Sequence, residues 1–172
     1  AGGYLGMADA AAQLAGKLGI AADEAARLLA NQTGKIVQQR FADQRSDLVV
    51  VRGIAVHGVC PHHLVPFRGL AHVAYLPGGR LHGFGRIARL VDAIGHRFTY
   101  QEWMTRDIAD ALMVHGRAAG AACVIEAEQL CLLLGEDRRG DERVVTQAFA
   151  GAFEQSEQAR NEFLRAIEGR RS

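Results

Sequence analysis

The 172-residue chain has few aromatic residues, almost no net charge and no long apolar run. Phe, Trp and Tyr make up 6% of the residues, and 20 Lys and Arg against 19 Asp and Glu give a net charge of +1. This balance of charge does not indicate a broad basic surface for binding nucleic acid or a membrane. No apolar stretch reaches the roughly 18 residues of a membrane-spanning helix, and the first residues lack the pattern of a secretion signal. We therefore expect a cytoplasmic protein.

Cysteine is also scarce. The three cysteines, at positions 60, 123 and 131, are too few for a disulfide scaffold, so they are expected to be core residues or metal ligands. Hydrophobic residues make up 49% of the chain and charged residues 23%, which is the ordinary mixture of a folded domain and excludes intrinsic disorder. The length suits one domain with a sizeable core.

Small side chains are abundant, with 20 glycines and a large number of alanines, while bulky core residues are few. Two explanations stand side by side. The chain could gain further burial by self-association, or the composition could reflect that of the genome.

The hydrophobic pattern predicts an α+β protein. Runs of β-branched and alternating apolar residues predict strands at 48–60, 68–76, 81–83, 121–134 and 143–153. A turn at Pro77–Arg80 is expected to join the second and third of these as a hairpin. Helical spacing predicts helices at 7–45 (in two pieces), 86–97, 103–118 and 156–168. Short connections between strands imply an antiparallel sheet with the helices packed on one face.

Smaller features refine these elements. The first long strand contains Gly53 and Gly58, and glycine inside a strand is typical of a β-bulge. Ser156 is a suitable N-cap for the last helix. The pair Gly83 and Gly85 is too weak a signal for a phosphate-binding loop.

The most informative segment is Cys60-Pro61-His62-His63, at the end of the first long strand. A strand that runs into a turn brings residues i and i+3 together, so Cys60 and His63 can reach one metal ion while His62 points elsewhere. This spacing is half of a zinc site, although a buried cysteine and two surface histidines explain it equally well.

A third ligand would come from Cys131 or Cys123. In an extended strand the residues 123, 125, 127, 129 and 131 share one face. Cys131 lies near the expected strand end, where sites are usually open, whereas Cys123 lies in an apolar run and is expected in the core.

Two cysteines and one histidine leave a fourth position for water, which is the arrangement of a catalytic zinc. Such a metal lowers the pKa of its water toward ~7 and supplies hydroxide. His62 is then a candidate proton donor or acceptor, with a fourth zinc ligand or a solvated histidine as the alternatives.

The motifs between residues 51 and 167 resemble those of GTP cyclohydrolase I. In chain order they are C-x-H-H at 60–63, L-x-P-F-x-G-x-A-H-V-A-Y-x-P at 64–77, G-F-G-R-I-A-R-L-V-D at 83–92, Gln101-Glu102, I-E-A-E-x-x-C at 125–131 and N-E-F-L-R-A-I at 161–167. Residues 1–46 match only as helices, so we expect an N-terminal helical segment at 1–46 and a catalytic domain at 47–172.

The resemblance implies the tunnelling fold, in which α+β subunits join antiparallel four-stranded sheets into a barrel. Members of the family stack two pentamers, and their active sites lie between subunits. We therefore expect a homo-oligomer, with a decamer as one possibility.

The resemblance also implies roles for individual residues. Zinc (Zn²⁺) is expected at Cys60, His63 and Cys131, with His62 as the catalytic histidine. Glu102, supported by Gln101, is expected to accept hydrogen bonds from the guanine edge, for which a carboxylate is suited. The alternative for Glu102 is an acidic residue that only stabilises a helix N-terminus.

A second group of residues is implied in phosphate binding. Arg86 stands where the family has a lysine, Arg89 matches a family arginine, and Gly85 precedes them. Residues three apart on a helix share a face, so the two guanidinium groups could clamp a polyphosphate. The alternative is a solvated basic face.

Three positions depart from the family pattern. Gln129 replaces a histidine of the catalytic set, Gly135 replaces an arginine that holds the triphosphate, and Pro61 replaces a glutamate. An amide cannot take up or deliver a proton near pH 7, so Gln129 removes a general acid-base group whose proton transfers are each worth roughly 10²- to 10⁴-fold.

The leading hypothesis is a zinc-dependent hydrolase that opens the imidazole ring of a guanine nucleotide. Its product is formylamino-pyrimidine if the reaction stops early, or 7,8-dihydroneopterin triphosphate if it is complete. One rival is a paralogue acting on another purine or a pterin-like heterocycle. Another is a non-catalytic zinc-binding module.

Overall fold

The computed structural model describes residues 21, 40–42, 46–134 and 142–168. The helices expected at 7–45 therefore lie outside the described residues, except at β1 (Arg40–Ala42), which is a strand and corrects the helical expectation there. Within the described part, no helix is both long enough and apolar enough to span a membrane.

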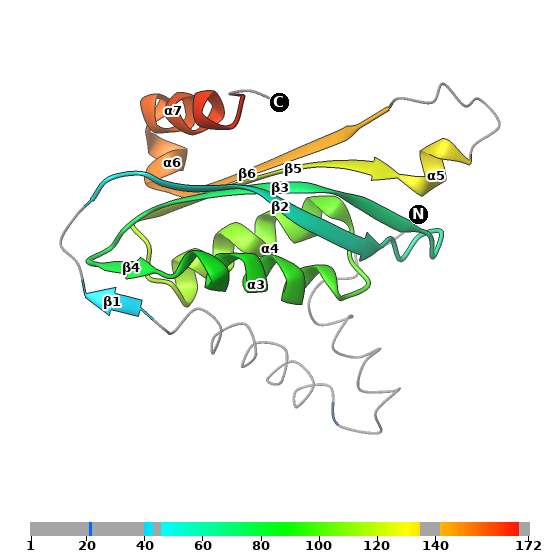
Figure 1. Cartoon of the computed structure of the whole chain (residues 1–172), viewed down its shortest axis with the longest axis horizontal. Coiled ribbons are helices and arrows are strands. Elements are labelled where there is room, and N and C mark those ends of the chain that lie inside the picture. Colours follow the sequence, from blue (N-terminus) through cyan, green and yellow to red (C-terminus); the bar gives the residue numbers. More distant parts are fainter. Residues whose placement is uncertain (1–20, 22–39, 43–45, 135–141, 169–172) are drawn as a thin grey trace.

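The centre of the protein is an antiparallel sheet with the strand order β2-β3-β5-β6 (Figure 1). The strands are β2 (Val49–Val59), β3 (Pro66–Leu76), β5 (Gly120–Gln129) and β6 (Val144–Gly151). Each coincides with a run that the sequence predicted, because β-branched and alternating apolar residues fit a pleated surface with buried faces. The expected α+β class and four-stranded sheet are confirmed.

A bulge in β2 keeps its apolar residues on one face. The register moves from Val51 opposite Val73 to Ile54 opposite Ala71, so one extra residue lies on β2. Gly53 has a positive φ of 74°, a conformation that glycine adopts without strain. The extra residue restores the alternation, and Val51, Ile54 and Val56 all face the main core.

The short strand β4 (Arg80–His82) corrects the predicted hairpin. It pairs with β1 as a separate two-stranded sheet and does not pair with β3. The reason is that β3 is an interior strand whose two edges already pair with β2 and β5. The backbone N–H of His82 instead donates a 3.0 Å hydrogen bond to the hydroxyl of Tyr75, which ties the start of the next helix to β3.

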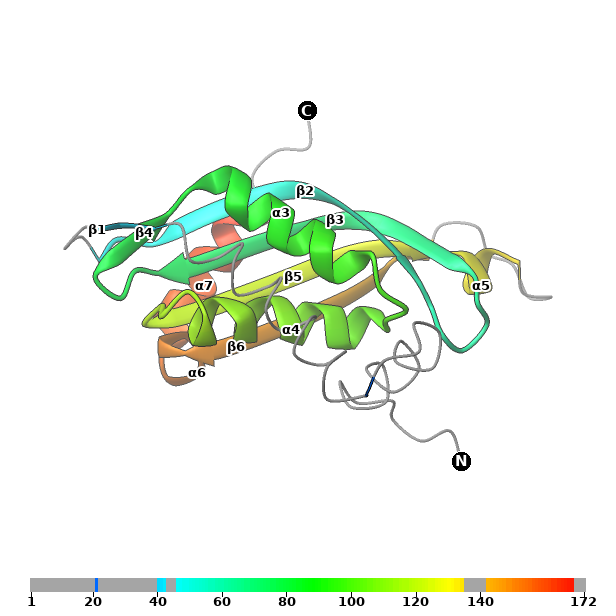
Figure 2. The same cartoon turned by 90° about the horizontal axis from the view of Figure 1, so that it is seen from below.

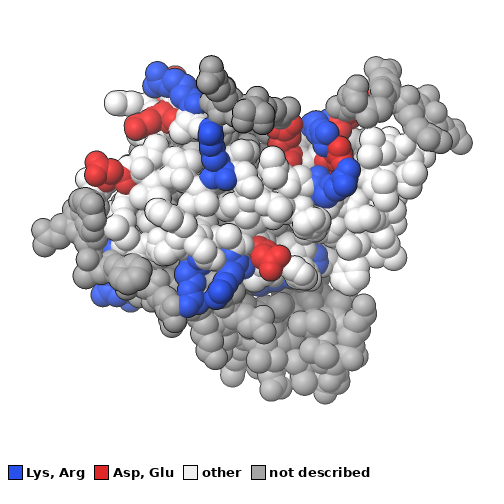
Figure 3. Space-filling model, in the orientation of Figure 1, with Lys and Arg blue, Asp and Glu red and all other residues white. Residues whose placement is uncertain are grey.

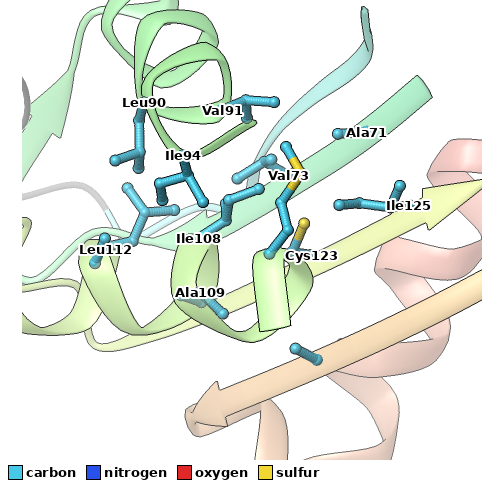
Figure 4. Close-up of a cluster of buried hydrophobic side chains, with 14 of the residues drawn as sticks. Ala71, Val73, Leu90, Val91, Ile94, Ile108, Ala109, Leu112, Cys123 and Ile125 are labelled. Atoms are coloured by element: carbon cyan, nitrogen blue, oxygen red, sulfur yellow. The ribbon is translucent and has the colours of Figure 1, made fainter. Parts of the chain in front are cut away.

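Helices α3 (Phe84–Gly95) and α4 (Gln101–Val114) cover one face of the sheet and lie along its strands (Figure 2). Their buried side chains pack against β3 and β5, as Figure 4 shows for Leu90, Ile94 and Ile108 opposite Val73 and Ile125. Cys123 lies in the same core with no exposed surface, as predicted. Burial raises the pKa of its thiol far above the ordinary range.

The last two helices lie on the opposite face, which corrects the expectation that all helices share one side (Figure 1). The chain leaves β6 at Gly151, whose φ is 60°, and continues as α6 (Ala152–Gln155) and α7 (Glu157–Glu168). Phe153 and Phe163 pack edge to face there, with ring centroids 6.3 Å apart. The predicted N-cap is confirmed, because Ser156 Oγ accepts a hydrogen bond from the backbone N–H of Ala159.

The strand expected at 121–134 ends earlier than predicted. β5 stops at Gln129, and α5 (Leu130–Leu133) is a single helical turn. Strand alternation therefore holds for Cys123, Ile125, Ala127 and Gln129, but it does not determine where Cys131 points.

Candidate functional site

The loop between β2 and β3 presents two histidines side by side. Backbone hydrogen bonds close the loop, from Cys60 N–H to the carbonyl of Val65 (3.0 Å) and from Leu64 N–H to the carbonyl of Cys60 (2.9 Å). The rings of His62 and His63 are exposed, with centroids 4.0 Å apart. The sequence led us to expect that His62 points away from His63. The two imidazoles instead lie side by side, and both are available to one ligand.

Leu64 follows these histidines in the left-handed region, at φ 55°, with 69% of its surface exposed. A leucine in that conformation carries strain of about 1–2 kcal/mol. Residues with strained backbone conformations of this kind cluster in functional loops.

Helix α5, which contains Cys131, lies at the same end of the sheet as this loop (Figure 1). Gly58 pairs with Phe67, and Phe67 pairs with Gln129, so the strands that lead to Cys60 and Cys131 flank the start of β3. Strands lie about 4.8 Å apart, which places these two strands about 10 Å from each other.

The donor types fit zinc, since two thiols and one imidazole are among its preferred ligands. The fold brings Cys60, His63 and Cys131 to one end of the sheet. Among the described residues, however, no three His, Cys, Asp or Glu side chains are grouped closely enough to hold a metal ion. The three-ligand site therefore stays a prediction.

Gln101, at the start of α4, is buried and connects this helix to the sheet. Its side-chain Nε2 donates to the carbonyls of Ile125 (3.0 Å) and Val144 (2.9 Å) and to the hydroxyl of Thr146 (3.2 Å). Its Oε1 accepts a 2.6 Å hydrogen bond from Nε2 of Gln129. The nitrogen and the oxygen of the Gln101 amide are therefore both hydrogen-bonded within the protein, so this side chain anchors the start of α4.

Glu102 follows directly and is exposed in the first turn of α4. Its position satisfies both explanations given for it, because a carboxylate at a helix N-terminus is favoured by the helix dipole and is also open to a ligand. The anchoring of Gln101 fixes the backbone from which Glu102 extends.

The expected phosphate-binding residues lie at the other end of the sheet. Gly85, Arg86 and Arg89 belong to the first half of α3, which begins beside β4 (Figure 1). The site end of β3 is at Phe67 and the β4 end is at Tyr75, and eight residues of strand span about 26 Å. The first half of α3 therefore lies toward the end of the sheet opposite Glu102.

The structure also has a groove of about 760 Å³ on the sheet face beside α7, which we did not predict from the sequence. Its lining includes Arg52, Glu126, Arg143, Leu164 and Ile167. Basic and acidic side chains are interspersed over the face shown in Figure 3. A signal was present in the alternation of β5, where acidic residues occupy the positions between core residues.

On the same sheet face, Glu128 lies between two arginines. It accepts a 2.8 Å hydrogen bond from Arg68 Nε and pairs with Arg143. The hydrogen bond from Arg68, together with the charge of Arg143, holds the pKa of this carboxyl below its ordinary value.

These features define an α+β protein of the tunnelling fold. The solved apo structure titled archaeosine synthase QueF-Like superposes with a TM-score of 0.52 over 63% of this chain and 97% of that chain. The sequence identity is 16%, so this likeness concerns the fold alone.

The chain belongs to the GTP cyclohydrolase I family, whose sequence model matches residues 18–168. Relatives named GTP cyclohydrolase 1 include those of Chromobacterium violaceum (74% identical over 128 residues) and Ralstonia nicotianae (73% over 129 residues). These matches cover 74% and 75% of this chain and 62% of each relative. A relative from Pseudomonas aeruginosa, named GTP cyclohydrolase 1 1, is 41% identical over 127 residues, which are 74% of this chain and 68% of the relative.

Proposed function

We propose that the protein is a zinc-dependent cyclohydrolase that opens the imidazole ring of GTP. The observation that carries the proposal is the position of the chemically suited residues in a member of this family. Cys60, His62, His63, Glu102 and Cys131 all lie at one end of the sheet, on the β2–β3 loop, α5 and the start of α4.

Glu102 would bind the guanine edge. Its two oxygens can accept hydrogen bonds from the ring N–H and the exocyclic amine, which point in nearly the same direction. The burial of Gln101 favours this role, because a carboxylate on an anchored helix turn loses little freedom when the base binds.

His62 would handle the proton transfers of ring opening. Water adds to C8, the bond from C8 to a ring nitrogen breaks, and that nitrogen takes a proton as it leaves. The His62 imidazole is exposed, and an imidazole is a side chain that can deliver a proton to a leaving nitrogen. Cys60, His63 and Cys131 would hold the zinc ion, which supplies an activated water when bound.

Gln129 decides how far the reaction goes. Ring opening gives a formylamino-pyrimidine, and loss of formate followed by rearrangement of the ribose gives 7,8-dihydroneopterin triphosphate. The later steps need further proton transfers, which an amide does not perform. We therefore propose that the protein opens the ring and that residue 129 determines how far the later steps proceed.

The triphosphate would be bound by a second copy of the chain. Arg86 and Arg89 lie in the first half of α3, which begins at the β4 end of the sheet, whereas Glu102 lies at the opposite end. Among the described strands, β2 and β6 each have one unpaired edge, so copies could extend the sheet and bring the two ends together. The proposed assembly is a homo-oligomer with shared sites, and a decamer is the form that the family resemblance implies.

The test is turnover of GTP by zinc-loaded protein, with products followed by mass spectrometry. Glu102→Gln and Arg86→Ala should each reduce kcat/KM at least tenfold, whereas Arg165→Ala, on the exposed side of α7, should not. The absence of both a ring-opened product and a dihydropterin after incubation with GTP would refute the proposal.

Mixing the two impaired variants tests the shared site. Refolding Glu102→Gln together with Arg86→Ala should restore part of the activity, because some sites then combine an intact Glu102 with an intact Arg86. Glu102→Gln refolded alone is the control. No recovery on mixing would show that one chain supplies both groups.

A further inference from the structure

The orientation of the Gln101 side chain is fixed by its partners. Two of the groups that Nε2 faces are backbone carbonyls, those of Ile125 and Val144, and carbonyls only accept hydrogen bonds. The amide cannot be reversed, because its oxygen would then face these two carbonyls. Oε1 must therefore point toward Gln129, 2.6 Å from its Nε2.

This geometry imposes a chemical requirement on position 129. The buried oxygen of Gln101 needs a donor, and Gln129 supplies it with an N–H. A carboxylate or an apolar side chain of the same size has no hydrogen that it can donate to the Gln101 oxygen. Position 129 therefore requires a side chain that places a hydrogen-bond donor there, as the N–H of Gln129 does.

We propose that Gln129 is a positioning residue, whose N–H donor holds Gln101 and thereby orients Glu102 for the guanine edge. The donor requirement follows from the hydrogen bonds alone, and the effect on guanine rests on the proposed function. The connection is short: Gln129 at the end of β5 binds Gln101, and Glu102 is the next residue of α4.

A second set of bonds makes the first turn of α4 sensitive to this contact. Thr105 Oγ1 donates to the backbone carbonyl of Gln101 (2.7 Å), and its oxygen lies 2.6 Å from the hydroxyl of Thr146. Thr146 in turn accepts from Gln101 Nε2. Loss of the Gln129 donor would leave an unpaired buried oxygen inside this network, and the helix turn that carries Glu102 would shift to reach solvent.

The first experiment compares three substitutions at this position. Gln129→Met removes the donor at nearly constant size, Gln129→Glu replaces it with an acceptor, and Gln129→His keeps an N–H. In turnover assays with GTP, Gln129→Met and Gln129→Glu should raise KM about tenfold or more, with Gln129→Glu the larger effect, while Gln129→His stays within about threefold of the original KM. Equal KM values for all four proteins, or an increase in Gln129→His as large as in Gln129→Met, would overturn the proposal.

The second experiment does not depend on any activity. Side-chain amide resonances of Gln129, assigned by their absence in Gln129→Met, should exchange slowly with solvent and shift when Gln101→Leu removes the acceptor. The urea midpoint should fall in Gln129→Met, and this fall should vanish in a Gln101→Leu background. Fast exchange together with additive effects would overturn the positioning role, even if the protein turns over GTP. Protection and coupling in a protein without GTP turnover would instead refute the proposed function and leave the donor requirement in place.

Discussion

The side-chain amide of Gln101 donates a 3.0 Å hydrogen bond to the backbone carbonyl of Ile125, so the first residue of α4 is attached to the interior of strand β5. A second bond from the same nitrogen reaches Val144 on β6. Because β5 and β6 are neighbours, one buried side chain joins a helix to two strands. The exposed Glu102 is held at the end of the sheet by this attachment.

Gln101→Leu should destabilise the protein. The substitution keeps the volume of the side chain and removes its hydrogen bonds to Ile125, Val144 and Thr146, and it leaves Nε2 of Gln129 without its acceptor. We expect a loss of about 2 to 3 kcal/mol in the free energy of unfolding, measured with urea. Gln158→Leu, on the exposed surface of α7, should change it by less than about 0.5 kcal/mol. Equal effects of the two substitutions would contradict the anchoring role.

Ile108→Ala should leave a cavity between α4 and the sheet. Ile108 has no exposed surface and belongs to the main core, so its truncation should cost about 2 to 5 kcal/mol. Val114→Ala, at the end of the same helix, removes a side chain that is 69% exposed and should cost less than about 0.5 kcal/mol. Thermal or urea unfolding distinguishes the two, and a small effect at Ile108 would contradict the packing in Figure 4.

Glu128 should make stability depend on pH on the acidic side. The hydrogen bond from Arg68 and the charge of Arg143 lower its pKa in the folded protein. A lowered carboxyl pKa stabilises the fold above the unfolded pKa, near ~4.3, and this contribution is lost as pH falls through the folded value.

The difference in urea midpoint between the original protein and Glu128→Gln should therefore be steady from about pH 7 to pH 5 and decrease below about pH 4. Glu162→Gln, at an exposed position of α7, controls for the loss of one negative charge. A difference that grows on acidification would have the wrong sign for this network.

The cysteines should separate into two kinds by metal content. Zinc measured by mass spectrometry in the purified protein should be lost in Cys60→Ser and Cys131→Ser, because serine is a poor zinc ligand. Cys123→Ser should retain zinc and lose stability, because it places a hydroxyl in a core site with no exposed surface. Equal zinc content in all four proteins would exclude the proposed ligands.

The main sheet and the helices α3 and α4 could be predicted from the sequence because each carries a clear period. β-branched alternation marked β2, and an apolar stripe marked α3. β1 could not be predicted, since its three residues are a strand only through pairing with β4. The apolar run at Leu130–Leu133 has no period that separates strand from helix, and it forms the turn α5.

The candidate site was predicted in part for similar reasons. The motif around Cys60 and the following histidines is local, and the loop keeps these residues together. The structural role of Gln101 was not predictable, because two of its partners are backbone carbonyls that no residue type reveals. The separation of Arg86 from Glu102 depends on α3 running along the sheet, which the sequence pattern does not show.

The central claim is that this site opens the imidazole ring of GTP at C8. The most direct measurement is ¹³C NMR of zinc-loaded protein incubated with GTP labelled with ¹³C at C8. The account predicts that the C8 resonance of guanine is replaced by that of a formamide, by that of free formate, or by both in sequence, and that Glu102→Gln slows this change at least tenfold. A C8 resonance that remains unchanged in the presence of active-site zinc would contradict the account.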